Sequence, residues 1–340
     1  MGPPIIPAAL IASGPEWPKA PPVSPSPASS SSSSDSPALR IRGLTKRYDN
    51  GVQALKGVDL EVLPGDFFAL LGPNGAGKST MIGIISSLVN LSEGQVEVFG
   101  IDLQARRSEA MRQIGLVPQE INFNLFEKPI DVLVNYAGFY GIDRATALVR
   151  AEEELRRAHL WEKANVVSRT LSGGMKRRLM IARAMMTAPR LLILDEPTAG
   201  VDIEIRRDMW NVLQQINRQG TTIILTTHYL EEAEQLCRNV AIIDRGQIVE
   251  RAPMRELLAK LDVEGFVLDI DGELPADLPV IDGASLVVRN AHTLELDKPR
   301  AMDLVGVFAA LGQAGVQVRS MRTRSNRLEE LFVRLTGKKD

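Results

Sequence analysis

The chain has 340 residues, which is enough for one large domain and a smaller one. Its formal net charge of −2, with histidine neutral, argues against a dedicated nucleic-acid-binding protein, because such proteins usually carry a basic face. Cys237 is the one cysteine, so an intrachain disulfide is excluded, which fits a reducing cytosol. No stretch of about 20 apolar residues predicts a transmembrane helix, so a role at a membrane would require a partner protein.

Residues 1–37 differ in composition from the rest of the chain. They are rich in proline, serine and alanine and include the consecutive serines Ser29–Ser34. A segment of this composition buries too little apolar surface to offset its conformational entropy. We therefore predict a disordered tail over residues 1–37.

Residues 38–260 alternate short apolar strands with helical stretches, an order typical of an α/β fold with a largely parallel sheet. A helix is expected from Gly77 to about Val89. Residues 129–165 are mostly helical in pattern, so we expect an inserted helical subdomain at about residues 120–188. The predicted strands are Leu39–Leu44, Gly57–Leu63, Phe67–Leu71, Gln95–Phe99, Ile114–Val117, Leu191–Leu194, Thr222–Thr226, Val240–Asp244 and Gln247–Arg251.

Residues 261–340 carry no phosphate-binding pattern, and we expect a small second α/β domain without a catalytic role. Amphipathic spacing predicts helices at Met302–Leu311 and Asn326–Leu335. The predicted strands are Phe266–Ile270, Leu286–Arg289, Thr293–Leu296 and Val316–Met321.

A glycine-rich loop matching GxxxxGK[ST] follows the predicted strand Phe67–Leu71 and precedes a helix. In this context the glycines let backbone N–H groups wrap phosphates, Lys78 reaches the β- and γ-phosphate oxygens, and Ser79 meets Mg²⁺. The sequence therefore predicts a nucleoside triphosphate site. The loop residues are Gly72, Pro73, Asn74, Gly75, Ala76, Gly77, Lys78, Ser79 and Thr80.

Two adjacent carboxylates, Asp195 and Glu196, end the apolar strand Leu191–Leu194. Buried carboxylates are costly unless they meet a cation or hydrogen-bond donors. We predict that Asp195 holds Mg²⁺, directly or through water, and that Glu196 polarises the attacking water. Ser172, Gly173 and Gly174 open another helix, whose free N–H groups suit a phosphate.

Three further side chains are candidates for the same site. His228 and Gln119 each follow a predicted strand, and ligands of open α/β sheets bind at the carboxyl ends of strands. His228 would then reach a γ-phosphate and the Gln119 amide would bind Mg²⁺ or water, although a lone histidine after a strand is more often structural. Tyr48 either stacks on adenine or is a core tyrosine with its hydroxyl in water.

Taken together, these motifs resemble the ATP-binding subunits of ABC transporters over about residues 38–260. Gly72–Thr80 corresponds to the Walker A loop, Leu171–Met175 to the signature, and Leu191–Glu196 to Walker B. Gln119 corresponds to the Q-loop, Ala199–Asp202 to the D-loop, and His228 to the switch histidine. The resemblance implies a P-loop NTPase fold with an inserted helical subdomain, ATP and Mg²⁺ as cofactors, and Asp202 and Tyr48 near the nucleotide.

The wording of LSGGMKRRL, DEPTAGVD and TTHYLEEAE resembles the ATPase subunits of ABC-2-type exporters, many of which carry a small C-terminal accessory domain. Met175 departs from the usual LSGGQ, and a methionine cannot replace the hydrogen bonds of a glutamine amide. We expect Ser172 and the backbone of Gly173 and Gly174 to retain the phosphate contacts. Met175 is also common in this subgroup.

The resemblance implies a head-to-tail homodimer, or a pair with a related subunit, in which the signature of one chain covers the ATP of the other. It also implies a separate membrane permease and a location on the cytoplasmic face of the cell membrane, with no nucleic acid bound. The permease would contact Gln119 and Glu120–Lys128, although the apolar residues there, Phe123, Leu125 and Phe126, could equally belong to the subdomain core. An importer subunit and a nucleotide-dependent interaction module remain the alternatives.

Overall fold

The computed structural model describes residues 36–259, 263–272, 274–275, 278–299, 301–324 and 327–336. The predicted tail, residues 1–37, lies outside these ranges except for its last two residues. The described part of the chain contains three sheets, of four, six and four strands. The predicted α/β fold class is confirmed.

The first sheet is antiparallel and has the strand order β2-β1-β4-β5. Its strands therefore do not belong to one largely parallel sheet, and that expectation is wrong for them. The reason lies in the connection between the first two strands, where the Tyr48 N–H donates to the Val52 carbonyl in a short turn. A parallel pair needs a crossover of a dozen or more residues. The strands are β1 Leu39–Arg47, β2 Gln53–Val62, β4 Glu93–Val98 and β5 Ile101–Asp102.

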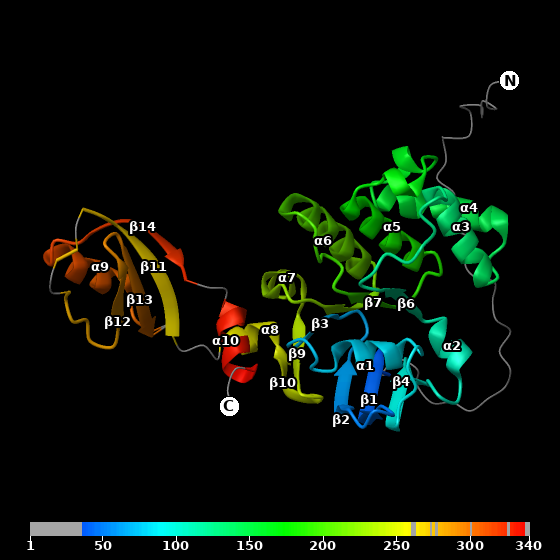
Figure 1. Cartoon of the computed structure of the whole chain (residues 1–340), viewed down its shortest axis with the longest axis horizontal. Helices are drawn as coiled ribbons and strands as arrows, with labels where there is room; N and C mark the ends of the chain where they lie inside the picture. The colour runs from blue at the N-terminus through cyan, green and yellow to red at the C-terminus, as the bar shows by residue number, and fades with distance from the viewer. Residues whose placement is uncertain are drawn as a thin grey trace. The chain divides into compact units, whose positions relative to one another are not determined.

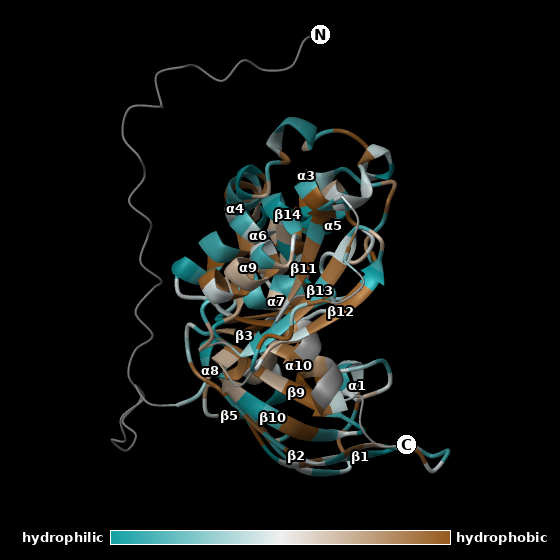
Figure 2. Cartoon of the chain, turned by 90° about the vertical axis from the view of Figure 1, so that its left-hand side faces the viewer, coloured by the Kyte–Doolittle hydropathy of each residue, from teal (hydrophilic) through white to brown (hydrophobic). Residues whose placement is uncertain are grey.

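The second sheet has the order β10-β9-β3-β8-β7-β6 and is parallel except for the edge strand β10. Its central strands are buried and apolar, as expected for a sheet covered on both faces, and Figure 2 colours β3 and β9 as hydrophobic. The order places the carboxyl ends of β3, β8, β7 and β6 side by side. The strands are β3 Phe67–Leu71, β6 Ile114–Val117, β7 Leu191–Asp195, β8 Thr222–Thr226, β9 Asn239–Asp244 and β10 Gln247–Pro253.

Helices cover this sheet over two separate apolar cores. Phe68 and Leu70 face one core with α1, and Phe67 and Leu71 face the other with α6. The first helix ends earlier than Val89, because Ser87 takes a left-handed conformation with φ 58° and turns the chain. The covering helices are α1 Lys78–Ile85, α2 Arg107–Met111, α6 Ile203–Arg218, α7 Leu230–Leu236 and α8 Met254–Ala259.

A helical region is inserted between β6 and β7 and has its own apolar core. It consists of α3 Pro129–Phe139, α4 Arg144–Arg157 and α5 Gly173–Met185, which lie together beyond β6 and β7 in Figure 1. Helix α5 belongs to two cores, because Leu179 packs among these helices whereas Met180 packs over the sheet. The insertion is thus fixed to the sheet mainly through α5.

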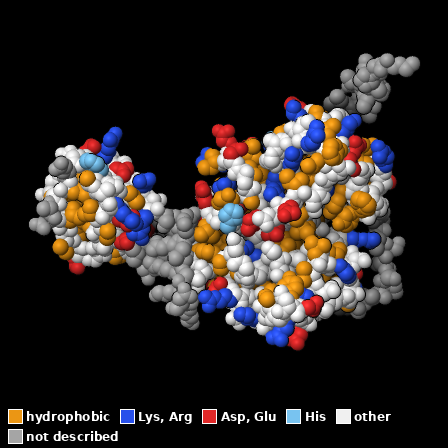
Figure 3. Space-filling model, viewed as in Figure 1, with side chains coloured by type: hydrophobic (Ala, Val, Ile, Leu, Met, Phe, Trp, Pro, Cys, Tyr) orange, Lys and Arg blue, Asp and Glu red, His pale blue; other side chains and the backbone are white. Residues whose placement is uncertain are grey.

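The third sheet is antiparallel, with the order β12-β13-β11-β14, and encloses a separate core with α9. Helix α10 joins a different core, since its Leu328 and Leu331 pack with residues of α7 and α8. The faces visible in Figure 3 mix acidic and basic side chains. The elements are β11 Val263–Asp271, β12 Ser285–Asn290, β13 Thr293–Pro299, β14 Gln317–Thr323, α9 Leu304–Gln313 and α10 Arg327–Thr336.

Glu154 of α4 makes the helical region sensitive to pH. It is buried, it accepts hydrogen bonds from Arg157 at 2.8 and 2.9 Å, and burial raises its pKa from 4.5 to about 7. Because the pKa is higher in the folded chain, the folded state loses stability as the pH rises through this interval. We expect Glu154→Gln, relative to the unsubstituted chain, to gain about 2 kcal/mol of unfolding free energy between pH 5 and pH 8.

The measurement is denaturant unfolding of both chains at the two pH values. Glu152→Gln is the matched control, because Glu152 lies on the same helix and pairs with Arg156 at 2.8 Å but has a 44% exposed side chain. A Glu154→Gln effect that is equal at pH 5 and pH 8 would contradict the prediction.

Candidate functional site

A cavity of 580 Å³ lies at the carboxyl ends of the parallel strands. Gly77, Lys78 and Ser79 line it from the loop after β3, and Gln119 lines it from the segment after β6. The remaining lining residues include the sequence-predicted Glu196 after β7 and His228 after β8. The cavity is also lined by Ala54, Asn74, Gly75 and Thr80.

The loop after β3 depends on a glycine at position 77. Gly77 has φ 110°, and a Cβ there would lie 2.8 Å from the carbonyl oxygen of Ala54. The ammonium of Lys78 donates to the carbonyls of Gly72 at 2.6 Å and Pro73 at 3.0 Å. Burial lowers the pKa of Lys78, whereas the carboxylates of Glu196 and Asp195 favour its charged form. A cation thus lies at the base of a loop shaped for an anion.

The two carboxylates after β7 are held by β8. Asp195 Oδ1 accepts a hydrogen bond from the Thr226 hydroxyl at 2.5 Å. The backbone N–H of Glu196 donates to the Thr226 carbonyl at 3.0 Å, and Glu196 itself has φ 48°, in the left-handed region. The sharp turn directs the Glu196 side chain into the cavity, where it is one of the lining residues.

Residues of the segments that follow β6 and β8 contact one carboxylate oxygen of Glu196. Its Oε2 accepts from Gln119 Nε2 at 3.0 Å and lies 3.2 Å from His228 Nδ1. The ring of His228 also packs against that of Tyr229, with ring centroids 4.1 Å apart and an angle of 40° between the ring planes. The structure therefore brings together Lys78, Gln119, Glu196 and His228, which the sequence had placed on four separate segments.

Oxygen donors for a hard cation are present beside this cluster. The Ser79 hydroxyl and the Gln119 amide line the cavity, and Asp195 ends the strand next to it. The Gln119 amide nitrogen donates to Glu196, so the amide oxygen of Gln119 lies on the side of the amide away from this nitrogen. Hydroxyl, amide and carboxylate oxygens are the ligands that Mg²⁺ accepts. The described residues contain no group of three or more His, Cys, Asp or Glu side chains that could hold a metal ion. The donor set fits a cation that is shared with a phosphate.

The signature residues Ser172, Gly173 and Gly174 do not line this cavity. Ser172 is the N-cap of α5, and its Oγ accepts from the Met175 N–H at 3.2 Å. Gly174 is needed for packing, because a Cβ there would lie 2.3 Å from Cγ2 of Ile205 on α6. Met175 packs against the core of the helical region.

Asp202 and Tyr48 also lie outside the cavity lining. Asp202 is the N-cap of α6, with Oδ1 accepting from the Ile205 N–H at 3.0 Å. Tyr48 is 37% exposed rather than a core residue, and its hydroxyl lies 3.2 Å from Oγ1 of Thr80 at the end of the phosphate-type loop. Its ring lies under the Lys46 ammonium at 4.9 Å.

Two residues that the sequence analysis missed support the site. Thr226 holds Asp195 and Glu196, as described above. Glu232 is fully buried and accepts from Thr198 Oγ1 and Trp210 Nε1, both at 3.0 Å. It joins the turn after Glu196 to α6 and to the helix after His228. No pattern distinguishes Glu232 from the neighbouring glutamates, because only the fold shows which of them points inward.

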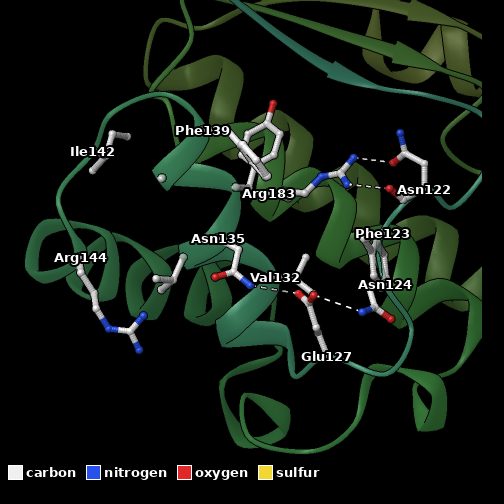
Figure 4. Close-up of a pocket in the computed structure, with 13 residues that line it drawn as sticks. Asn122, Phe123, Asn124, Glu127, Val132, Asn135, Phe139, Ile142, Arg144 and Arg183 are labelled. Carbon is white, nitrogen blue, oxygen red and sulfur yellow. Dashed lines mark hydrogen bonds between the residues drawn. The ribbon is translucent and has the colours of Figure 1, made fainter.

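A second cavity, of 670 Å³, lies in the helical region beside the segment that follows Gln119. Figure 4 shows Asn124 and Asn135 hydrogen-bonded to Glu127, with Phe139 on the opposite side of the opening. Phe139 and Phe126 nearby are 88% and 73% exposed, whereas Phe123 is partly buried in two cores. The segment after Gln119 therefore supplies both core and surface aromatic groups.

Comparison with known proteins places this site in a family. A family model described as "ABC transporter" matches residues 55–199. The chain is 36% identical over 307 residues to the linearmycin resistance ATP-binding protein LnrL of Bacillus subtilis (strain 168), covering 88% of this chain and 98% of that protein. It is 35% identical over 311 residues to the Nod factor export ATP-binding protein I of Cupriavidus metallidurans, with coverage of 88% and 97%.

The fold of this chain is also similar to that of a solved ATP-binding cassette. The dimeric ATP-binding cassette MJ0796, in a post-hydrolysis state bound to ADP and phosphate, is 28% identical to this chain with a TM-score of 0.59. The likeness covers 64% of this chain and 99% of that one.

The close approach of α5 and α6 yields a stability prediction. We expect Gly174→Ala to lower the unfolding free energy by about 2 kcal/mol, because the added methyl group overpacks against Ile205. Gly173→Ala is the matched control, since no atom lies within 4 Å of a Cβ built there. The measurement is denaturant unfolding of the single variants and of Gly174→Ala with Ile205→Ala. The second substitution should restore part of the loss, and equal effects at positions 173 and 174 would refute the packing argument.

Proposed function

Because this chain belongs to the ABC transporter family as an ATP-binding subunit, we propose that it powers an exporter through a head-to-tail dimer coupled to a separate permease. It is an ATPase, and the proposal concerns how and for what the ATP is used. The observation that carries the hydrolytic part of the proposal is the position of the Glu196 carboxylate. This carboxylate contacts Gln119 and His228 in the cavity that Lys78 also lines. The names of the relatives, one for drug resistance and one for Nod factor export, favour export over import.

The proposed reaction uses the cavity as follows. The loop amides and Lys78 bind the β- and γ-phosphates. The positive charge of these groups stabilises the negative charge that spreads over the γ-phosphate during transfer. Glu196 accepts a hydrogen bond from the attacking water and orients it. Gln119 and His228 hold the Glu196 oxygen, and His228 reaches the departing γ-phosphate.

The fit of the oxygen donors favours Mg²⁺ as the cation that accompanies ATP. Ser79, Asp195 and Gln119 would hold it. When bound, it neutralises phosphate charge and so favours attack at the γ-phosphorus. Thr226 contributes by fixing one oxygen of Asp195.

The proposal of a head-to-tail dimer rests on the separation of the signature from the cavity. Ser172 caps α5 and Gly173 and Gly174 open it, at the position where the N–H groups of a helix have no partner within the helix. These residues are not among those that line their own chain's cavity. A helix N-terminus binds phosphate well. We assign this one to the ATP held by the partner subunit, with Asp202 and Tyr48 completing the nucleotide contacts. The dimeric state of the solved relative supports this arrangement.

A separate permease is part of the proposal because the relatives are named as ATP-binding proteins for linearmycin resistance and Nod factor export. The described residues contain no helix able to cross a membrane. We place the contact with the permease at the second cavity, beside Glu120–Lys128, where the exposed Phe126 and Phe139 provide apolar surface. Phe123 also lines this cavity, while it packs against two cores with part of its side chain. The complex would lie on the cytoplasmic face of the membrane.

The first test of the mechanism is Glu196→Gln. We expect this variant to bind ATP but to hydrolyse it about 100-fold more slowly, because an amide cannot accept the water's proton. Phosphate release measures the rate, and size-exclusion chromatography with ATP should show an accumulated dimer. Unchanged turnover would remove Glu196 from this role.

The second test concerns the shared site. Lys78→Ala and Ser172→Arg subunits should each be inactive alone, but a mixture forms dimers in which one site has both Lys78 and Ser172 intact. We expect hydrolysis to reappear in the mixture, at up to about one quarter of the unsubstituted rate for random pairing with independent sites. If both variants fold and dimerise and no mixture regains activity, the head-to-tail model is wrong.

A further inference from the structure

Helix α5 is hydrogen-bonded to the segment that carries Gln119. The guanidinium of Arg177 donates to the backbone carbonyl of Pro118 at 3.0 Å and to that of Gln119 at 2.5 Å. Arg177 lies within one turn of the signature, on the helix that Ser172 caps. The two carbonyls belong to the chain that leaves β6, so this contact joins two segments far apart in sequence.

The position of Arg177 is unusual for an arginine. Its side chain is buried, with 7% exposure, and its hydrogen-bond acceptors are carbonyl oxygens rather than a carboxylate. Burial lowers its pKa, and the nearby charges of Asp195 and Glu196 favour its charged form. A buried guanidinium is costly unless its donors are satisfied, and the two carbonyls provide acceptors for Nη1 of Arg177.

Gln119 is held at both ends. Its backbone carbonyl accepts from Arg177, and its side-chain amide donates to Glu196 Oε2 at 3.0 Å. One residue therefore separates the helix of the signature from the carboxylate that orients water. A displacement of Arg177 would move the backbone from which the Gln119 amide reaches Glu196.

We propose that Arg177 is a positioning residue for ATP hydrolysis, which fixes Gln119 against Glu196 and thereby connects the signature helix to its own chain's nucleotide site. The second half of this statement rests on the head-to-tail arrangement proposed above. When the partner's ATP engages the start of α5, the helix transmits its position to Gln119 through Arg177. Each site then responds to occupancy of the other.

Arg183 provides the comparison that separates positioning from plain structural support. It is also a buried arginine of α5, and it donates to the backbone and side chain of Asn122 at 3.2 and 2.5 Å. It thus holds the same segment three residues further on, without touching Gln119. Loss of either arginine removes a buried cation from the same helix.

The experiment is a double-mutant cycle on the rate of hydrolysis, measured under single-turnover conditions so that slow rates remain measurable. We expect Arg177→Met to lower the rate about tenfold with little change in ATP affinity, because it misplaces Gln119 without altering the phosphate loop. In a Gln119→Ala background the same substitution should lower the rate by less than about twofold, since the group that it positions is already gone. Arg177→Lys keeps the charge and one donor and should recover part of the rate.

Arg183→Met should lower the rate by the same factor in both backgrounds. Thermal unfolding of every variant tests whether it is folded. If Arg177→Met is unfolded, Arg177→Lys replaces it in the double-mutant cycle. Equal Arg177 effects with and without Gln119 would overturn the proposal. Recovery of hydrolysis in the mixture of Lys78→Ala and Ser172→Arg subunits reports on the proposed head-to-tail dimer, whereas the ratio of the two Arg177 effects reports on Arg177 alone.

Discussion

Two adjacent carboxylates at the end of a buried strand impose the constraint around which the site is built. Asp195 and Glu196 leave β7 between β8 and β6, where a charge without partners is costly. The neighbouring strand on one side supplies Thr226 and His228, and the neighbour on the other side leads to Gln119. The strand order β8-β7-β6 is therefore what satisfies the pair. The contacts of Gln119 and His228 with Oε2 fix the orientation of the Glu196 carboxylate.

Helix α5 has three simultaneous tasks in this architecture. Its N-terminus presents the signature, its buried residues join the core of the sheet to the core of the helical region, and its arginines hold the segment after β6. The close contact of Gly174 with Ile205 adds α6 to the same assembly. These contacts fix α5 to the sheet, to the helical region and to α6 at once. The proposed connection between two binding sites requires a helix that is fixed in this way.

The sequence predicted the parts of the structure that depend on local pattern. Strands β3, β6 and β8 have the bounds predicted from their apolar runs, and the phosphate-type loop precedes a helix as expected. The prediction of parallel pairing is wrong for β1 and β2, because a short turn and not a helix connects these two strands. The clustering of Gln119, Glu196 and His228 followed from a general rule about strand ends. The roles of Glu232 and Gly174 were not predictable, since each depends on a partner that only the fold brings near.

Helix α10 has a consequence for the order in which the protein is made. Its Leu328 and Leu331 belong to the same apolar core as Phe67 of β3, so the first strand of that core waits for residues far later in the chain. Those residues are still inside the ribosome when the earlier segments have emerged. The core of the sheet can therefore close fully only after Arg327–Thr336 has emerged. Until then, the surface of α7 and α8 that α10 covers is exposed to solvent and to chaperones.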